Sequence, residues 1–129
     1  MHRSRLSAIV IDCLDEQFEE CVAFWAAAFG GPPPRKPAKR QRYVKLKAHP
    51  GDLDILLQRV ERDPGIHLDF ESDSVSREAE RLEAAGAERK YRIKSWWVMQ
   101  DPGDNAFCVI RKQKPELLEK SEPWPDGSA

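Results

Sequence analysis

The sequence predicts an α+β domain in which one strand–helix–strands unit occurs twice. Three observations support this fold class. Strand-like alternation of apolar and polar residues opens the chain and returns near its middle. An amphipathic helical pattern follows each alternating segment, and further short strand-like segments follow each helix. We expect a single domain over residues 1–112, made of two modules at about 6–60 and 65–112, and a separate tail at 113–129.

The first module begins with a strand over residues 6–13, which alternates apolar and smaller or polar side chains. Asp15 is the expected N-cap of the helix that follows, because its carboxylate can accept backbone N–H groups of the first turn. Gly30 and Gly31 are expected to end this helix. The proline-rich and basic segment 32–42 is then expected to be a solvated loop.

Two further strands are expected to complete the first module. They cover residues 43–47 and 53–60, with a turn at His49-Pro50-Gly51-Asp52 between them. Alternation in the second of these strands places Gln58 on the same face as Asp54. The module therefore has apolar residues available for one face and polar residues for the other.

The second module opens with the most informative strand, over residues 66–71. Alternation places Ile66, Leu68 and Phe70 on a face that we expect to be covered by a helix. The opposite face carries His67, Asp69 and Glu71, and we expect it to face solvent or a cavity. Asp73 is the expected N-cap of the helix and Gly86 its end, and the strands that follow are predicted at 90–93, 96–100 and 106–111, with a hairpin turn at 101–105.

The composition excludes several classes of partner. The chain has 129 residues with 21 Lys plus Arg against 22 Asp plus Glu, so no net field favours nucleic acid or an anionic membrane. Its first residues lack the long apolar segment of a signal peptide or a membrane span. The three cysteines, Cys13, Cys21 and Cys108, form no CxxC pair, which indicates free thiols and a cytoplasmic location. We expect a small-molecule ligand or another protein as the partner.

Four segments, in their order and spacing, carry a family resemblance: FWAAAFGG, HLDFESDSV, RLEAAGA and WWVMQDPGDNAFCVI. Together with the repeated unit they resemble the vicinal oxygen chelate superfamily, and within it the glyoxalase-like and bleomycin-resistance-type proteins. The resemblance extends over roughly residues 6–112. It implies two βαβββ modules whose sheets curl into a mixed sheet around a cleft, with helices on the outer face, and commonly a homodimer.

The resemblance also implies where metal ligands would lie in metal-using members. His67 matches a ligand position on the first strand of the second module. The other positions fall on Ala8 or Ile9, on Gln58 or Asp54, and on Cys108. Divalent metals of the glyoxalase type need several converging nitrogen and oxygen ligands. We therefore expect no cofactor and no tightly bound metal, with a divalent metal as the alternative.

Strand alternation predicts that the polar faces of both modules contribute to one ligand-binding surface. Its expected residues are Asp12, Gln58, His67, Asp69, Trp96, Trp97 and Cys108, with one of the two adjacent tryptophans toward the core. His67 is the candidate catalytic residue, because an unperturbed imidazole pKa of about 6.5 suits a base at neutral pH. Three functions remain open: a binding protein for a small, partly apolar compound; a lyase, isomerase or dioxygenase-like enzyme that uses His67 as base or metal ligand; and a dimeric interaction module with a vestigial cleft.

Overall fold

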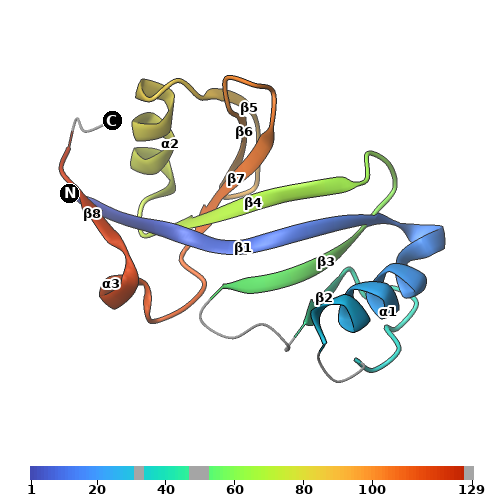
Figure 1. The fold of residues 1–129 in the computed structure, drawn as a ribbon. Helices are drawn as coiled ribbons and strands as arrows, with labels where there is room; N and C mark the ends of the chain where they lie inside the picture. The colour runs from blue at the N-terminus through green and yellow to red at the C-terminus, as the bar shows by residue number, and fades with distance from the viewer. Residues whose placement is uncertain (31–33, 47–52, 127–129) are drawn as a thin grey trace. The chain divides into compact units, whose positions relative to one another are not determined.

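The computed structural model describes residues 1–30, 34–46 and 53–126. In these residues the chain forms eight strands, three α-helices and one short 3-10 helix, so the fold is α+β as the sequence predicts (Figure 1). The chain divides into two compact units. Unit 1 contains Met1–Ser7 and the chain from Leu68 onward, and unit 2 contains Ala8–His67. No helix among the described residues is long and apolar enough to cross a membrane.

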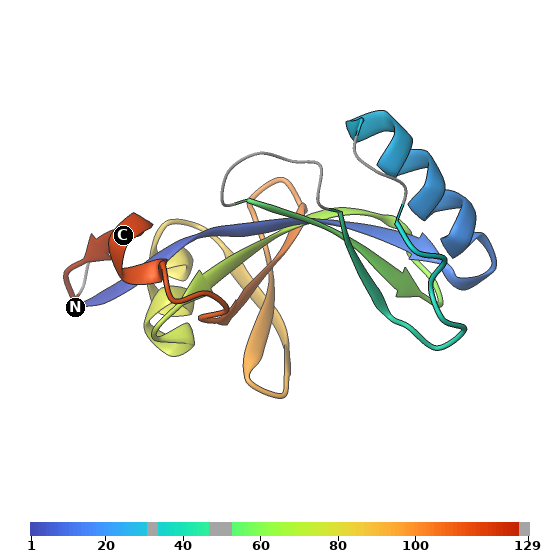
Figure 2. The same cartoon turned by 90° about the horizontal axis from the view of Figure 1, so that it is seen from below.

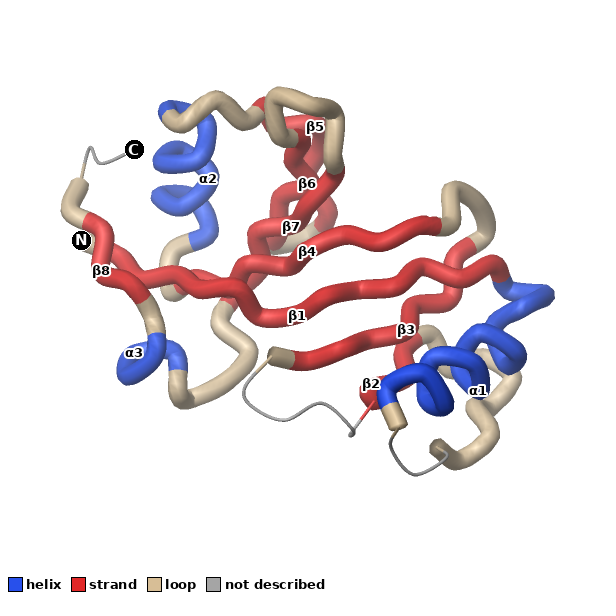
Figure 3. The backbone as a smooth tube through the Cα atoms, viewed as in Figure 1, coloured by secondary structure: helices blue, strands red, loops and turns tan. Residues whose placement is uncertain are grey.

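Unit 2 contains three paired strands with one helix packed on them, and the first residues of a fourth strand, β4 (Gly65–Ser72) (Figure 3). Strand β3 (Asp54–Val60) pairs in parallel with β1 (His2–Leu14) and antiparallel with β2 (Tyr43–Leu46). Helix α1 (Phe18–Phe29) covers one face of this sheet. The buried cluster beneath α1 is apolar and consists of Ile11, Cys13, Phe18, Val22, Ala26, Val44, Leu46, Ile55 and Leu57.

Unit 1 contains a further group of parallel and antiparallel strands and has its own helix (Figure 2). Its strands are β4 (Gly65–Ser72, from Leu68), β5 (Glu88–Ile93), β6 (Trp96–Gln100) and β7 (Ala106–Arg111). They lie in the order β4-β7-β6-β5, and β4 and β7 are parallel while the other pairs are antiparallel. Helix α2 (Val75–Ala84) packs over one face, where Ala79, Met99 and Val109 are fully buried.

The C-terminal tail, which the structure describes to residue 126, belongs to unit 1. After the short helix α3 (Leu117–Lys120), strand β8 (Glu122–Trp124) pairs antiparallel with the first residues of β1. Trp124 Nε1 donates a hydrogen bond of 2.9 Å to Ser4 Oγ, and the guanidinium of Arg81 lies 3.8 Å from the centre of the Trp124 ring. The tail is therefore a structural part of this unit.

The start of α1 differs from its sequence prediction. Asp15, the expected N-cap, instead opens a 3-10 turn, η1 (Asp15–Gln17). Helix α1 begins one turn later at Phe18, and no side chain caps it. Asp15 Oδ1 accepts a 2.6 Å hydrogen bond from Arg59 on β3, so this carboxylate binds a neighbouring strand rather than the helix. The predicted helix end is confirmed, because Gly30 adopts a left-handed φ of 79°.

The N-cap of α2 lies one residue later in the structure than the sequence predicts. Ser74 Oγ, and not the Asp73 carboxylate, accepts the N–H of Arg77 at 3.3 Å. Asp73 Oδ1 instead accepts the backbone N–H of Arg3 at 2.8 Å. Both residue types are good caps, and a donor brought in from the first strand decides between them.

The sequence overestimated how far the helices cover the sheets. Phe18, Val22 and Val109 are buried. Ile66 and Leu68, however, are 62% and 38% exposed, and Phe29 is exposed at the end of α1. Alternation determines on which face of a strand a side chain lies, but it carries no information on whether a helix extends over that position. The predicted turn at 49–52 lies outside the described residues.

Candidate functional site

Unit 2 has one face of its sheet opposite to α1, and polar side chains form a row across that face. The register pairs Asp12 on β1 with Gln58 on β3, and Gln58 with Tyr43 on β2. Side chains that are directly opposite in neighbouring strands share a face. The adjacent pair, Ile11 and Leu57, lies on the other face, in the cluster beneath α1. The three polar residues therefore lie on the side that α1 does not cover.

Hydrogen bonds connect this row in pairs. His67 Nδ1 lies 2.9 Å from Asp12 Oδ2, and each of these side chains is 16% exposed. Gln58 Nε2 donates to the Tyr43 hydroxyl at 3.2 Å. We use the term polar row for His67, Asp12, Gln58 and Tyr43. Three of its members were predicted as site residues, and the structure brings these three together.

Asp12 also has a second carboxylate oxygen, Oδ1, that is buried and accepts no hydrogen bond from the described part of the chain. A buried carboxylate oxygen of this kind needs a donor to offset its desolvation.

Tyr43 is the member of the row that sequence reasoning missed. Its position was available from alternation with Val44, which lies in the apolar cluster.

Unit 1 also has a sheet face opposite to its helix. The register aligns Asp69 on β4, Cys108 on β7, Val98 on β6 and Tyr91 on β5 across this face. Tyr91 is exposed, and the other three side chains are half-buried. The predicted residues Asp69 and Cys108 are therefore direct neighbours on a surface that also offers apolar and aromatic groups.

The two adjacent tryptophans lie on opposite faces of β6, as expected for neighbours in a strand. Trp96 pairs with Ile93 and lies on the same face as Val98. Trp97 packs against the cluster beneath α2, and the Arg89 guanidinium lies 5.0 Å from the centre of its ring. Trp96 therefore stays a candidate site residue, whereas Trp97 belongs to the interior below α2.

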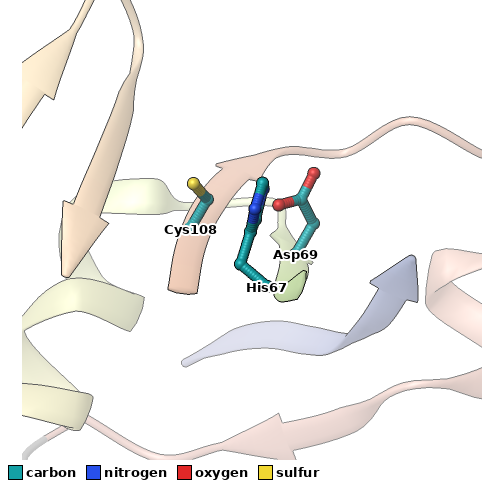
Figure 4. A group of neighbouring side chains, drawn as sticks. All are labelled: His67, Asp69 and Cys108. Atoms are coloured by element: carbon teal, nitrogen blue, oxygen red, sulfur yellow. The ribbon is translucent and has the colours of Figure 1, made fainter. Parts of the chain in front are cut away.

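Three of the predicted residues have donor atoms suited to a metal ion. Strand β4 carries His67 and Asp69 two residues apart, and Cys108 is the partner of Asp69 on β7. One nitrogen, oxygen or sulfur atom of each residue lies within 4.8 Å of the others (Figure 4). Imidazole, carboxylate and thiolate are all known metal ligands. Among the residues that the structure describes, His67, Asp69 and Cys108 are thus the group that could hold a metal ion. That no metal binds tightly stays a prediction.

Glu71 was expected to share an open face with His67 and Asp69, and this expectation was wrong. Its side chain is fully buried in unit 1. It accepts hydrogen bonds from Arg5 Nε at 3.1 Å, from Ser7 Oγ at 2.9 Å and from the backbone N–H of Gln113 at 3.3 Å. Glu71 therefore links the first strand to the segment after β7.

Comparisons with known proteins agree with this architecture. A family model described as a glyoxalase-like domain matches residues 8–110. No curated protein sequence matches the chain. Among solved structures, the NAD-dependent benzaldehyde dehydrogenase from Legionella pneumophila is similar, with a TM-score of 0.56 and 11% identity over 82% of this chain and 98% of that one. At this identity the likeness concerns the fold alone.

Proposed function

Since the chain belongs to the glyoxalase-like domain family of the vicinal oxygen chelate superfamily, we propose that it binds a small molecule through the polar row of unit 2. One observation carries the proposal. Four hydrogen-bonding side chains, one from each of four strands, gather on a sheet face opposite to α1. Ligand sites in proteins typically combine a few such polar groups with apolar surroundings.

The chemistry of the row indicates what kind of group it recognises. Asp12 offers a carboxylate, His67 an imidazole, Gln58 an amide and Tyr43 a hydroxyl. Together they can both donate to and accept from a ligand. We therefore expect a compound whose head group carries both hydrogen-bond donors and acceptors.

A melting-temperature screen over metabolites and drug-like compounds tests this proposal. A ligand that binds only the folded chain must raise the melting temperature, by an amount that grows with the logarithm of its concentration relative to its dissociation constant. For any compound found, His67→Ala and Gln58→Ala should weaken binding about tenfold, which corresponds to the loss of one hydrogen bond. Gln17→Ala is the matched control, because Gln17 is exposed in η1. If both row variants bind every compound as tightly as the wild type, the proposal is wrong.

A second function, proton transfer, is favoured by the contact between His67 and Asp12. A carboxylate 2.9 Å from Nδ1 favours the tautomer that donates from this nitrogen, which makes Nε2 the basic atom. An imidazole held in this way suits a lyase or an isomerase that removes a proton next to a carbonyl group. The polar row would then bind a substrate rather than a sequestered ligand.

Deuterium exchange distinguishes the two functions. A bound compound with an acidic C–H group is incubated in D₂O, and its proton signals are followed by NMR. Proton transfer predicts exchange with the wild type, none with His67→Ala and slower exchange with Asp12→Asn. Binding without exchange would leave only the first function.

A further inference from the structure

The basic segment 34–42 of unit 2 contains a tight turn at residues 38–41. The Gln41 N–H donates to the Ala38 carbonyl at 3.0 Å. The Gln41 side chain closes the turn a second time, because its Oε1 accepts the Ala38 N–H at 3.1 Å. Lys39 and Arg40 are the two central residues, and both are exposed. We use the term basic turn for residues 38–41.

Arg59 on β3 fixes the basic turn to the sheet of unit 2. Its Nε donates to the Gln41 carbonyl at 3.0 Å, and its Nη2 donates to the Ala38 carbonyl at 3.2 Å. Its Nη1 donates to Asp15 at 2.6 Å, and the guanidinium lies 4.4 Å from the centre of the Phe18 ring. A planar guanidinium can make several such bonds at fixed angles. The backbone of the turn is therefore held in place before a partner binds.

The positive charge of this segment is largely unpaired. Residues 35–42 include five cations and no acid, and the cations are Arg35, Lys36, Lys39, Arg40 and Arg42. Lys36 Nζ lies 3.8 Å from Glu19 Oε2, and both side chains are mostly exposed. In the part of the chain that the structure describes, the other four cations form no ion pair. Like charges held close together repel each other, and an anionic partner would offset this repulsion.

We propose that the basic turn binds a short acidic segment of a partner protein. A carboxylate of such a segment can accept two parallel N–H bonds from Arg40 or one from the ammonium group of Lys39. A single exposed ion pair contributes little, because holding two mobile side chains costs entropy. A turn whose backbone is already fixed lowers this cost for two neighbouring pairs. The site is independent of the polar row and of the ligand proposed for it.

The surroundings of the basic turn favour a short acidic segment over a nucleic-acid strand. Such a strand carries a phosphate about every 3.4 Å and continues beyond a single turn. Acids lie next to the basic turn, because Arg59 also binds Asp15 and Lys36 lies near Glu19. Glu16, in η1, is exposed as well. These carboxylates would repel a continuous polyanion, whereas a peptide with a few acids can contact the turn alone.

Fluorescence anisotropy with labelled peptides tests the proposal. The full chain is titrated into a peptide rich in Asp and Glu, and into the same peptide with Asn and Gln at these positions. The acidic peptide should bind and the amide peptide should not, and added salt should weaken binding because the contacts are exposed. A single-stranded oligonucleotide of equal charge should bind more weakly. No binding of the acidic peptide, or tighter binding of the oligonucleotide, would overturn the proposal.

Charge-matched double variants locate the contact. Lys39→Glu combined with Arg40→Glu should weaken binding of the acidic peptide at least about tenfold, because two attractions become repulsions. Arg62→Glu combined with Lys112→Glu is the matched control, since both residues are exposed and the net charge changes equally. This control should change binding by less than about twofold, because salt screens distant charges. Equal losses in the two double variants would mean that net charge alone attracts the peptide, and the proposal would be wrong.

Arg59→Lys tests the contribution of the held turn. Lysine keeps the charge but lacks the planar group that donates to both carbonyls of the turn. Binding of the acidic peptide should weaken severalfold although the net charge is unchanged. Gln41→Ala should act in the same direction, and Gln41 is exposed, so its replacement leaves the interior intact. Circular dichroism checks that both variants fold. If the folded variants bind the peptide like the wild type, the proposal of a preformed site is wrong.

Discussion

Helices α1 and α2 have the same place in the two repeats of the chain, yet the interiors beneath them differ in chemistry. All side chains in the buried cluster under α1 are apolar. The buried residues of α2 itself are Glu78 and Ala79. Glu78 receives two hydrogen bonds of 2.8 Å from Arg81 and lies 2.8 Å from His2 Nε2. One helix is thus anchored by hydrophobic burial, and the other by a charged network as well.

This difference teaches that one secondary-structure pattern can be stabilised in two ways with different responses to conditions. Hydrophobic burial is non-directional and does not depend on pH. A buried carboxylate is tolerated only while its partners are in place, because its desolvation is otherwise uncompensated. We therefore expect the stability of unit 2 to depend mainly on the volume of its buried side chains. The stability of unit 1 should also depend on the protonation of its buried carboxylate.

The largest expected effect is in the apolar interior of unit 2. Phe18 is fully buried, and Phe18→Ala should lower the free energy of unfolding by about 3–5 kcal/mol. Phe24→Ala is the control on the same helix, because Phe24 is mostly exposed, and it should change this free energy by less than about 1 kcal/mol. Guanidinium unfolding followed by circular dichroism measures both. Equal effects of the two substitutions would contradict the packing described here.

The charged anchor of unit 1 should be nearly as sensitive. Glu78→Gln keeps the volume but removes the charge that Arg81 and His2 face, so we expect a loss of about 2–3 kcal/mol at neutral pH. Glu80 lies on the exposed side of α2. Glu80→Gln should therefore change the free energy of unfolding by less than about 0.5 kcal/mol. The same unfolding measurement compares the two variants. A Glu78→Gln variant as stable as the wild type would show that the network does not stabilise the fold.

The pH dependence of the wild type follows from the same residue. Burial disfavours the charged form of Glu78, but hydrogen bonds from Arg81, His2 and Ser4 outweigh it and hold the pKa of Glu78 below its ordinary 4.5. This stabilisation is present above the unfolded pKa and is lost as the pH falls through the lower, folded pKa. Unfolding curves taken from neutral to acid pH should show that the free energies of unfolding of the wild type and of Glu78→Gln become more similar as the pH falls. The difference in this free energy between the wild type and Phe18→Ala should stay constant.

A smaller effect is expected where the tail contacts unit 1. Trp124→Ala removes the ring beneath Arg81 and the hydrogen bond to Ser4, and should cost about 1–2 kcal/mol. Trp124→Phe keeps a ring for Arg81 and should cost less. Limited proteolysis should cut the tail of the alanine variant faster than that of the phenylalanine variant. Equal cleavage of both would mean that the contact between the aromatic ring and Arg81 does not hold the tail.

The smallest expected effect on stability is at the starts of the two helices. Ser74→Ala removes the side-chain cap of α2 and should cost about 1 kcal/mol. Gln17→Ala should cost almost nothing, because Gln17 makes no capping bond to α1. Ser76→Ala, inside α2 and exposed, controls for the loss of a serine. Thermal unfolding measures all three, and a costly Gln17→Ala would contradict the uncapped start of α1.

Local periodicity predicted most of the fold because it reports on each segment separately. The strands at 96–100 and 106–111 agree with the structure, and so does the end of α1 at Gly30. Strand β8 was missed because a three-residue segment that contains proline has no alternation to detect. It forms by pairing with residues at the other end of the sequence, His2–Ser4.

Buried charge was the other feature that the sequence did not reveal. Glu71 and Glu78 have the spacing of solvent-facing acids, and their partners Arg5 and His2 lie more than sixty positions away in the chain. Only the tertiary structure brings such partners together. Local patterns therefore present a satisfied buried acid and an exposed one in the same way.

The candidate site was predicted to the extent that it depends on strand alternation. Asp12, Gln58 and His67 gather in unit 2 because each lies on the polar face of its strand. The choice between Trp96 and Trp97 needed the register of β6 with its neighbours, which the sequence does not contain. The homodimer, the cytoplasmic location and the absence of a cofactor stay predictions.

The distribution of tryptophan has an optical consequence. Trp25 is the only tryptophan in the sequence between residues 8 and 67, and Phe24 and Phe29 lie 5.2 and 6.0 Å from it, measured between ring centres. The other three, Trp96, Trp97 and Trp124, belong to unit 1. A variant with these three replaced by phenylalanine would emit from unit 2 alone, and Trp25→Phe would emit from unit 1 alone. Coincident fluorescence transitions in the two variants would mean that the units unfold as one cooperative block, although each has its own core.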